Sequence, residues 1–281
     1  MNSGAVLRII RPVNCAMIGF AVIVGEFVSK PPGIPPVQTA LGFLTGFFVC
    51  AYSMVVNDVY DVEVDRVNQP GRPIPSGGLS VGGAARLSIV LLLAGIACSV
   101  LSLDAAAVAI ALLYVFLSWL YNARAKKEGL AGNLIVASSV AIPFVYGGVV
   151  SGGNIFSSLL LMMAFTSFFA GAGREVVKAM SDTEGDAKRG IASVARTRGL
   201  RASALVGALF FLLAVLTSWL PLILKLANQV YTFGVLVPDA VFVYLAASIL
   251  RDHDPKNAMR VRRTALVGML VGLFVFVGGG F

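Results

Sequence analysis

The sequence predicts an all-α membrane protein in which about nine transmembrane helices form one bundle. Hydrophobic residues make up 58% of the 281 residues and charged residues only 13%, which lies far outside the range of soluble globular domains. The mean hydropathy of +0.87 agrees with this class. At ~20 apolar residues per crossing, the chain has room for roughly eight or nine spans. We therefore expect residues 1–281 to form a single membrane domain.

Nine apolar stretches follow one another along the chain, separated by charged or Pro- and Gly-rich breaks. The first begins after Arg8 and Arg11 and runs into Glu26 and a proline cluster without a small-residue cleavage site, so we expect a retained helix. The stretches lie near 12–28, 37–57, 81–101, 103–121, 131–150, 155–177, 201–221, 229–250 and 264–280.

Basic residues fall almost entirely on one side of these stretches. If the nine helices alternate in direction, only Lys30 and Lys225 of the 22 basic residues lie opposite the N-terminus. Cytoplasmic loops hold an excess of Lys and Arg, so we expect a multi-pass protein of the cell membrane with a cytoplasmic N-terminus and an external C-terminus. This asymmetry explains the net charge of +8 without a nucleic-acid partner. We expect these residues to contact anionic lipid headgroups instead.

Half of the fourteen acidic residues lie in two short windows. Residues 57–65 hold four of them and residues 182–186 hold three. The windows close the second and the sixth apolar stretches, so both are expected at the same membrane depth on the N-terminal side. Because His253 is the only histidine and the three cysteines form no CxxC pair, a metal site here would use oxygen ligands.

The spacing within the first window places its oxygen atoms together. Asn57, Asp61 and Asp65 are spaced i, i+4 and i+8, which is one face of a helix, and Asp58 lies beside that face. Like charges stacked at this spacing destabilise a helix unless a cation neutralises them. Oxygen ligands without His or Cys favour Mg²⁺, which typically binds a few carboxylates together with substrate phosphates.

The second window repeats the spacing, since Asp182 and Asp186 are four residues apart, although Gly185 favours unwinding there. One such window is readily explained as solvated acids at a helix end. Two matched windows favour a function, because charges this near the bilayer are costly unless they are paired or used. The basic residues near the windows are Arg66, Arg72, Arg124, Lys126, Lys127 and Lys178. They would suit a metal-bound diphosphate, although each of them except Lys178 is also explained as a topology determinant.

Residues 57–68, followed by Arg72-Pro73-Ile74-Pro75-Ser76-Gly77, closely resemble the first signature of the UbiA family of intramembrane prenyltransferases. Residues 182–186 resemble its second, DxxxD, signature. Tyr121-Asn122 and residues 129–133 match the pattern of the family after the fourth helix. The resemblance covers nearly the whole chain.

This resemblance implies a nine-helix bundle around a central cavity that opens laterally to lipid, with Mg²⁺ and a prenyl diphosphate bound by the two Asp motifs. The implied metal ligands are Asn57, Asp58, Asp61, Asp65, Asp182 and Asp186. The residues expected to bind the diphosphate are Arg66, Arg72, Tyr121, Lys126, Lys127 and Lys178. Those expected to be catalytic are Asp58, Asp61, Asp182 and Lys178.

Within the family, residues 174–186 are most similar to archaeal members that attach a geranylgeranyl group to the sn-2 hydroxyl of geranylgeranylglyceryl phosphate. The implied donor is a prenyl diphosphate and the implied acceptor a lipid phosphate. An aromatic acceptor such as 4-hydroxybenzoate is the alternative within the family. A cation or phosphate transporter is the alternative from another class, but transporter sites normally lie near the bilayer midplane. These windows lie at an interface.

Overall fold

The chain folds into a bundle of long antiparallel helices, seen in a computed structural model that describes residues 3–29, 33, 35–188 and 190–279. This part of the chain contains no β-strand. Its helices are α1 (Ser3–Ile10), α2 (Pro12–Ser29), α3 (Pro36–Tyr60), α4 (Val62–Asn68), α5 (Val81–Leu101), α6 (Ala105–Ala123), the 3₁₀ turn η1 (Ala125–Glu128), α7 (Leu130–Val150), α8 (Ser158–Ser181), α9 (Thr183–Lys188), α10 (Val194–Ile223), α11 (Gln229–Gly234), α12 (Leu236–Arg251) and α13 (Pro255–Gly279).

Nine helical segments within the described ranges are long and apolar enough to cross a membrane, which confirms the predicted fold class. Eight are single helices, and the other combines α11 with α12. Each coincides with one predicted apolar stretch. The largest difference is in α13, which begins at Pro255 rather than near 264, because its basic first turns continue the helix beyond the apolar residues.

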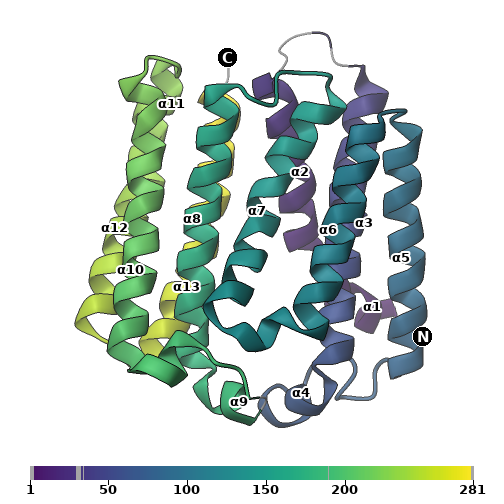
Figure 1. Ribbon diagram of the computed structural model, residues 1–281, viewed down its shortest axis with the longest axis vertical. Coiled ribbons are helices and arrows are strands. Elements are labelled where there is room, and N and C mark those ends of the chain that lie inside the picture. The colour runs from purple at the N-terminus through teal and green to yellow at the C-terminus, as the bar shows by residue number, and fades with distance from the viewer. Residues whose placement is uncertain (1–2, 30–32, 34, 189, 280–281) are drawn as a thin grey trace.

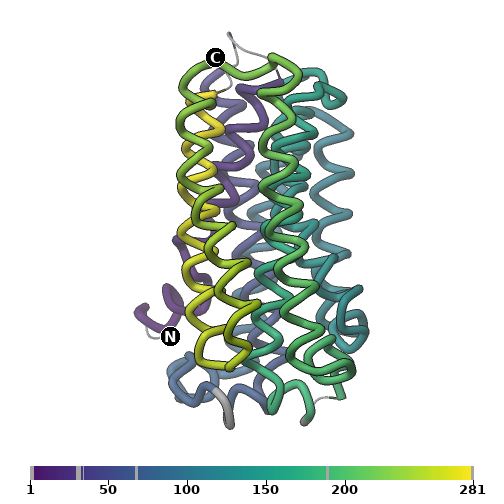
Figure 2. Tube along the Cα trace, turned by 90° about the vertical axis from the view of Figure 1, so that its left-hand side faces the viewer, coloured from purple at the N-terminus to yellow at the C-terminus, as the bar shows by residue number. Residues whose placement is uncertain are grey.

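The connections between the spans divide the bundle into two ends. Figure 1 shows α4 and α9 at the end near the N-terminus, whereas the C-terminus lies at the opposite end. The tube in Figure 2, turned by 90°, shows the same arrangement of long helices lying side by side. Because α4 and α9 carry residues of the two acidic windows, we call this the acidic end of the bundle.

The spans form two groups that close around a common interior. In the first group α3 packs against α2, α5 and α6, and in the second α8 packs against α10 and α13. Contacts of α7 with α8 and of α2 with α13 join the groups. Glycines permit the tightest approach: a Cβ at Gly147 of α7 would lie 2.0 Å from the carbonyl oxygen of Val22 in α2.

Candidate active site

A cavity of about 980 Å³ lies between the two groups of helices, which is near the upper end of the range for ligand pockets. Both acidic windows line it, together with side chains from α2, α3, α6, α7, α8, α10, α12 and α13. The expected central cavity is therefore present. Because α4 and α9 also contact each other, the two windows meet at the acidic end of this cavity.

The helical register of the first window continues through a break. Helix α3 ends at Tyr60 and α4 begins at Val62, but Asp61 between them keeps helical angles (φ −92°, ψ −1°). The Asp61 N–H donates to the carbonyl oxygen of Asn57 (3.0 Å), and the Asp65 N–H donates to that of Asp61 (2.9 Å). Asn57, Asp61 and Asp65 therefore share one face, as their spacing predicts, and all three line the cavity.

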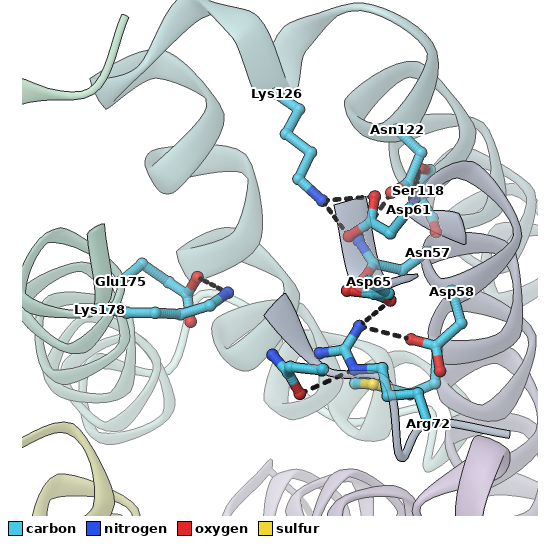
Figure 3. A network of polar contacts seen from close by, with 12 residues as sticks. Asn57, Asp58, Asp61, Asp65, Arg72, Ser118, Asn122, Lys126, Glu175 and Lys178 are labelled. Atoms are coloured by element: carbon cyan, nitrogen blue, oxygen red, sulfur yellow. Dashed lines mark hydrogen bonds and ion pairs between the residues drawn. The ribbon is translucent and has the colours of Figure 1, made fainter. Parts of the chain in front are cut away.

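Asp61 is held by a lysine from the turn after α6. The Lys126 Nζ atom lies 2.6 Å and 2.9 Å from the two carboxylate oxygens of Asp61, and Figure 3 shows Lys126 reaching across to it. The same ammonium group lies 5.7 Å from the centre of the Tyr121 ring, within the range of a cation–π contact. The side-chain amides of Asn57 and Asn122 meet beside this pair at 2.8 Å. Lys126, Tyr121 and Asn122 all line the cavity.

The other two aspartates of the first window share an arginine. Arg72 Nη1 lies 2.5 Å from Asp65 and 3.3 Å from Asp58 (Figure 3). Asp58, which is 3% exposed, also pairs with Arg11 at 2.5 Å. Arg11 lies between α1 and α2, where Pro12 begins the next helix. Cations from distant segments therefore neutralise the stacked carboxylates, with Asp58 behind the cavity wall and Asp65 in it.

The second window differs in its backbone and its exposure. Helix α8 ends at Ser181, and Asp182 (φ −111°, ψ 13°) precedes α9. The break therefore falls at Asp182, whereas Gly185, where unwinding was expected, lies inside α9. The Asp186 N–H donates to the Asp182 carbonyl oxygen at 2.9 Å, which preserves the i, i+4 relation. Both side chains line the cavity, and Arg262 of α13 contacts Asp182 at 3.3 Å.

Burial raises the pKa of Asp186 above its ordinary value, and the nearby Asp182 carboxylate acts in the same direction. Burial disfavours the charged form, and so does a like charge at short range. A cation placed between these carboxylates would reverse the effect. Asp186 is therefore suited to a ligand that carries positive charge.

Across the cavity from the first window, three charged residues of α8 form a linked group. Glu175 is buried and accepts from Arg174 Nη1 at 2.7 Å and from Lys178 Nζ at 2.9 Å. Figure 3 shows Glu175 and Lys178 opposite Lys126 and Asp61. Two cations sharing one carboxylate leave a positive charge in this wall. A diphosphate placed between the walls would meet basic groups on both sides.

Two of the predicted diphosphate residues lie outside the cavity lining. Arg66 points to the surface, where it pairs with Glu63 at 2.9 Å, and the two side chains are 59% and 81% exposed. The backbone of Lys127 joins two segments, since its carbonyl oxygen accepts a hydrogen bond from the Ala192 N–H at 2.9 Å. That bond ties the turn after α6 to the segment before α10. The basic residues Arg72 and Lys126 line the cavity instead.

Sequence reasoning gave no role to several polar residues of this site. Arg11, Asn122, Arg174, Glu175 and Arg262 all line the cavity. The available signal was composition, because acids and bases within an apolar helix such as α8 are costly unless they are paired or used. Which residues pair depends on packing between helices far apart in sequence.

The donor set fits Mg²⁺. Within the described ranges, no group of three or more His, Cys, Asp or Glu side chains is placed to enclose a metal, since the first-window carboxylates face basic partners. The cavity nevertheless offers carboxylate and amide oxygens from both windows. Mg²⁺ usually binds one or two carboxylates plus substrate phosphates rather than an all-protein cage. The site therefore suits a metal that arrives with a phosphorylated ligand.

A helical membrane bundle with two acidic motifs at one end of an internal cavity is the architecture of an intramembrane enzyme that binds a metal and a phosphorylated ligand. The sequence pattern of the UbiA prenyltransferase family matches residues 18–276. The chain belongs to this family.

Other proteins are similar to this chain in sequence and in fold. A digeranylgeranylglyceryl phosphate synthase of Archaeoglobus fulgidus is 36% identical over 99% of this chain and 95% of its own, and one of Methanocaldococcus jannaschii is 33% identical over 97% and 95%. A solved structure of a digeranylgeranylglyceryl phosphate synthase has a TM-score of 0.77 at 31% identity, covering 99% of this chain and 98% of the other. A UbiA homologue of Archaeoglobus fulgidus bound to DMAPP and Mg²⁺ has a TM-score of 0.67 at 18% identity, with 97% and 99% covered.

Proposed function

We propose that this protein is a Mg²⁺-dependent prenyltransferase that moves a geranylgeranyl group from its diphosphate to the sn-2 hydroxyl of geranylgeranylglyceryl phosphate. The observation that carries the proposal is the convergence of both acidic motifs at one end of a single membrane cavity. The names of the relatives, which match over nearly their full lengths, support the archaeal lipid as the acceptor. The whole chain, residues 1–281, is taken as the single domain that performs the reaction.

The proposed metal ligands come from both windows: Asn57, Asp58, Asp61, Asp65, Asp182 and Asp186. Bound Mg²⁺ would neutralise the diphosphate and stabilise it as a leaving group. Asp61, Asp65, Asp182 and Asp186 present their carboxylates to the cavity. Asp58 pairs with Arg72 from outside the cavity lining, so its carboxylate would have to turn into the cavity to become a ligand. A Mg²⁺-bound UbiA homologue of the same fold supports this choice of metal.

The basic residues bind the diphosphate by changing partners. Lys126 and Arg72 hold Asp61 and Asp65 in the structure described. When these carboxylates turn to a cation, both basic groups become available to diphosphate oxygens, where charge-assisted hydrogen bonds are strongest. Lys178 approaches from the opposite wall, and Tyr121 supports Lys126. Arg66 and Lys127 act from outside, as long-range charges rather than direct contacts.

Transfer begins when the bond between prenyl C1 and the diphosphate oxygen breaks, with the electron pair leaving on the diphosphate. The allylic cation lies where the cavity wall becomes apolar, so water that would quench it is excluded. The acceptor hydroxyl oxygen then forms the new bond to C1, and its proton passes to the released diphosphate. The protein contributes position and electrostatic stabilisation, which are worth most inside a water-poor site.

For the orientation, we propose that the acidic end faces the cytoplasm and the C-terminus lies outside. The distribution of basic residues supports this, because Lys225 lies in the connection between α10 and α11 at the other end. Lys30, also expected there, lies outside the described residues. The test labels single cysteines placed at 127 and 225 with a membrane-impermeant thiol reagent in intact cells. We expect the cysteine at 225 to be labelled and the one at 127 to be protected; the reverse pattern would contradict the proposal.

The function is tested with purified protein, labelled geranylgeranyl diphosphate and Mg²⁺. Geranylgeranylglyceryl phosphate and 4-hydroxybenzoate are offered in separate reactions, and products are separated by chromatography. We expect a diether product with the lipid phosphate, none with the aromatic acid, and loss of product when EDTA removes the metal. Product from the aromatic acid alone would overturn the lipid assignment in favour of the aromatic alternative.

A further inference from the structure

A carboxylate lies in the wall of the same cavity, at a distance from both acidic motifs. Asp239, in the first turn of α12, is 7% exposed and lines the cavity with Ser218 of α10. The Ser218 hydroxyl lies 2.9 Å and 3.0 Å from the two Asp239 oxygens, and Trp219 Nε1 donates to one of them at 2.8 Å. Tyr231 OH donates to the Ser218 carbonyl oxygen at 2.9 Å. This is a built polar cluster within a membrane-spanning region.

Its depth in the bundle follows from a contact between α8 and α10. The hydroxyl groups of Thr166 and Thr217 are 3.0 Å apart, which places Ser218 level with Thr166. Thr166 precedes Lys178 by twelve residues on the same helix. At 1.5 Å per residue, the cluster therefore lies about 18 Å from the diphosphate end of the cavity. That depth is comparable to an extended chain of four isoprene units.

The wall between these two levels is mainly apolar. It includes side chains of α8, α10, α12 and α13, among them Ala170, Ala214, Phe242 and Met269. A prenyl chain lying along this wall gains from burial with each carbon. The gain stops at Asp239, because a hydrocarbon cannot replace water around a hydrogen-bonded carboxylate without cost.

We propose that Asp239, with Ser218 and Trp219, forms the polar end of the donor's prenyl channel and limits the donor to about four isoprene units. The proposal rests on the proposed prenyl transfer and adds a determinant of donor length to it. Asp239 is a specificity-determining residue, remote from the reacting atoms. A purely structural role in joining α10 to α12 is the competing explanation, and it makes no prediction about donor length.

The test is a competition between donors in one reaction. Farnesyl, geranylgeranyl and geranylfarnesyl diphosphates, with three, four and five isoprene units, are supplied together with one acceptor, and the products are quantified by mass spectrometry. The product ratio reports relative kcat/KM and does not depend on how much of the enzyme is folded. For the wild type we expect the four-isoprene product to exceed the five-isoprene product by about tenfold, the discrimination typical of a small misfit in a pocket.

Three variants then decide the role of Asp239. Asp239→Ala removes the carboxylate and opens space, so the ratio of five- to four-isoprene product should rise about tenfold. Asp239→Asn, the matched control, keeps the size and polarity and should leave the ratio within about twofold of wild type. Ala214→Leu adds bulk one turn nearer the motifs on α10 and should shift preference toward three isoprene units.

An unchanged ratio in Asp239→Ala, whatever its thermal stability, would overturn the proposal. If Asp239→Ala yields no folded protein, the Ala214→Leu result decides, and no shift toward the shorter donor would overturn it. Absence of transfer from every donor by the wild type would instead refute the proposed function. The two failures are therefore distinguishable.

Discussion

The two acidic motifs carry similar side chains at the same spacing, but their surroundings differ. In the first, buried carboxylates are held by short ion pairs, such as Asp61 with Lys126 at 2.6 Å and Asp65 with Arg72 at 2.5 Å. In the second, Asp182 is 36% exposed and its contact with Arg262 is 3.3 Å long. The first motif is therefore set in position before ligand arrives. The second motif is left open to receive it.

The backbone explains this difference. The Asp61 N–H keeps the i−4 hydrogen bond of a helix, to the Asn57 carbonyl oxygen at 3.0 Å, so the residues of the first motif stay on one face. The Asp182 N–H bonds instead to the Ala179 carbonyl oxygen, three residues back, at 3.4 Å, and the following turn of α9 lines the cavity. We infer that the first motif fixes the position of the metal and diphosphate. The second then completes their coordination.

The largest expected effect is that of Asp61→Ala. It removes a cavity carboxylate from the fixed motif and leaves Lys126 without that partner, so we expect kcat to fall by about 10³-fold. Steady-state assays with the lipid acceptor measure it. Glu63→Ala is the matched control, because Glu63 lies in the same window but is 81% exposed and faces away. Equal losses in the two variants would contradict the assignment of the cavity face.

Asp182→Ala should have the next largest effect. It removes a ligand from the open motif while the first motif still holds the metal, so we expect about a 10²-fold loss in kcat. A higher Mg²⁺ concentration for half-maximal activity should accompany this loss. Titration of activity against Mg²⁺ gives both values. Full activity in this variant would show that the second motif takes no part in binding.

Arg72→Ala should lower both stability and activity. It leaves the buried Asp58 and Asp65 with fewer cationic partners, and breaking a buried ion pair on one side costs about 3 kcal/mol of unfolding free energy. Loss of the residue that orients two ligands should reduce activity by about 10–100-fold. Thermal unfolding in detergent and steady-state kinetics measure the two effects. Arg66→Ala, an exposed neighbour, should change stability by less than about 1 kcal/mol.

Arg262→Ala should have the smallest effect of the series. Its contact with Asp182 is long and partly exposed, so its loss should cost no more than about 1 kcal/mol of stability. Activity should fall only a few-fold. A loss as large as that of Arg72→Ala would show that the second motif is also held in place by its cation, and would remove the contrast between the motifs.

Much of the fold could be predicted from the sequence because its signals are local. Apolar length alone identifies the nine spans, and the i, i+4 spacing places Asn57, Asp61 and Asp65 on one face. The start of α13, near the acidic motifs, was harder to predict from the sequence, since its basic first turns carry no apolar signal. Its buried residues Ala258 and Val261 pack there into the core formed with α8, α10 and α12.

The ion pairs of the site could not be predicted in the same way. Lys126 and Asp61 are 65 positions apart, and Arg11 and Asp58 are 47 apart. Proximity in sequence was misleading for Arg66, which follows Asp65 directly but points to another face of α4, because adjacent helical residues do not face each other. Asp239 carried a usable signal, since an acid inside an apolar stretch is costly unless it is paired or functional.

The most direct test of the account measures binding of geranylgeranyl diphosphate to the purified protein by calorimetry, without acceptor, with and without Mg²⁺. We predict that wild-type protein binds the diphosphate tightly only when Mg²⁺ is present, and that Asp61→Ala and Asp182→Ala each weaken this binding. Glu63→Ala should bind as the wild type does. Binding that is independent of Mg²⁺, or unchanged in both aspartate variants, would contradict a shared metal–diphosphate site between the two motifs.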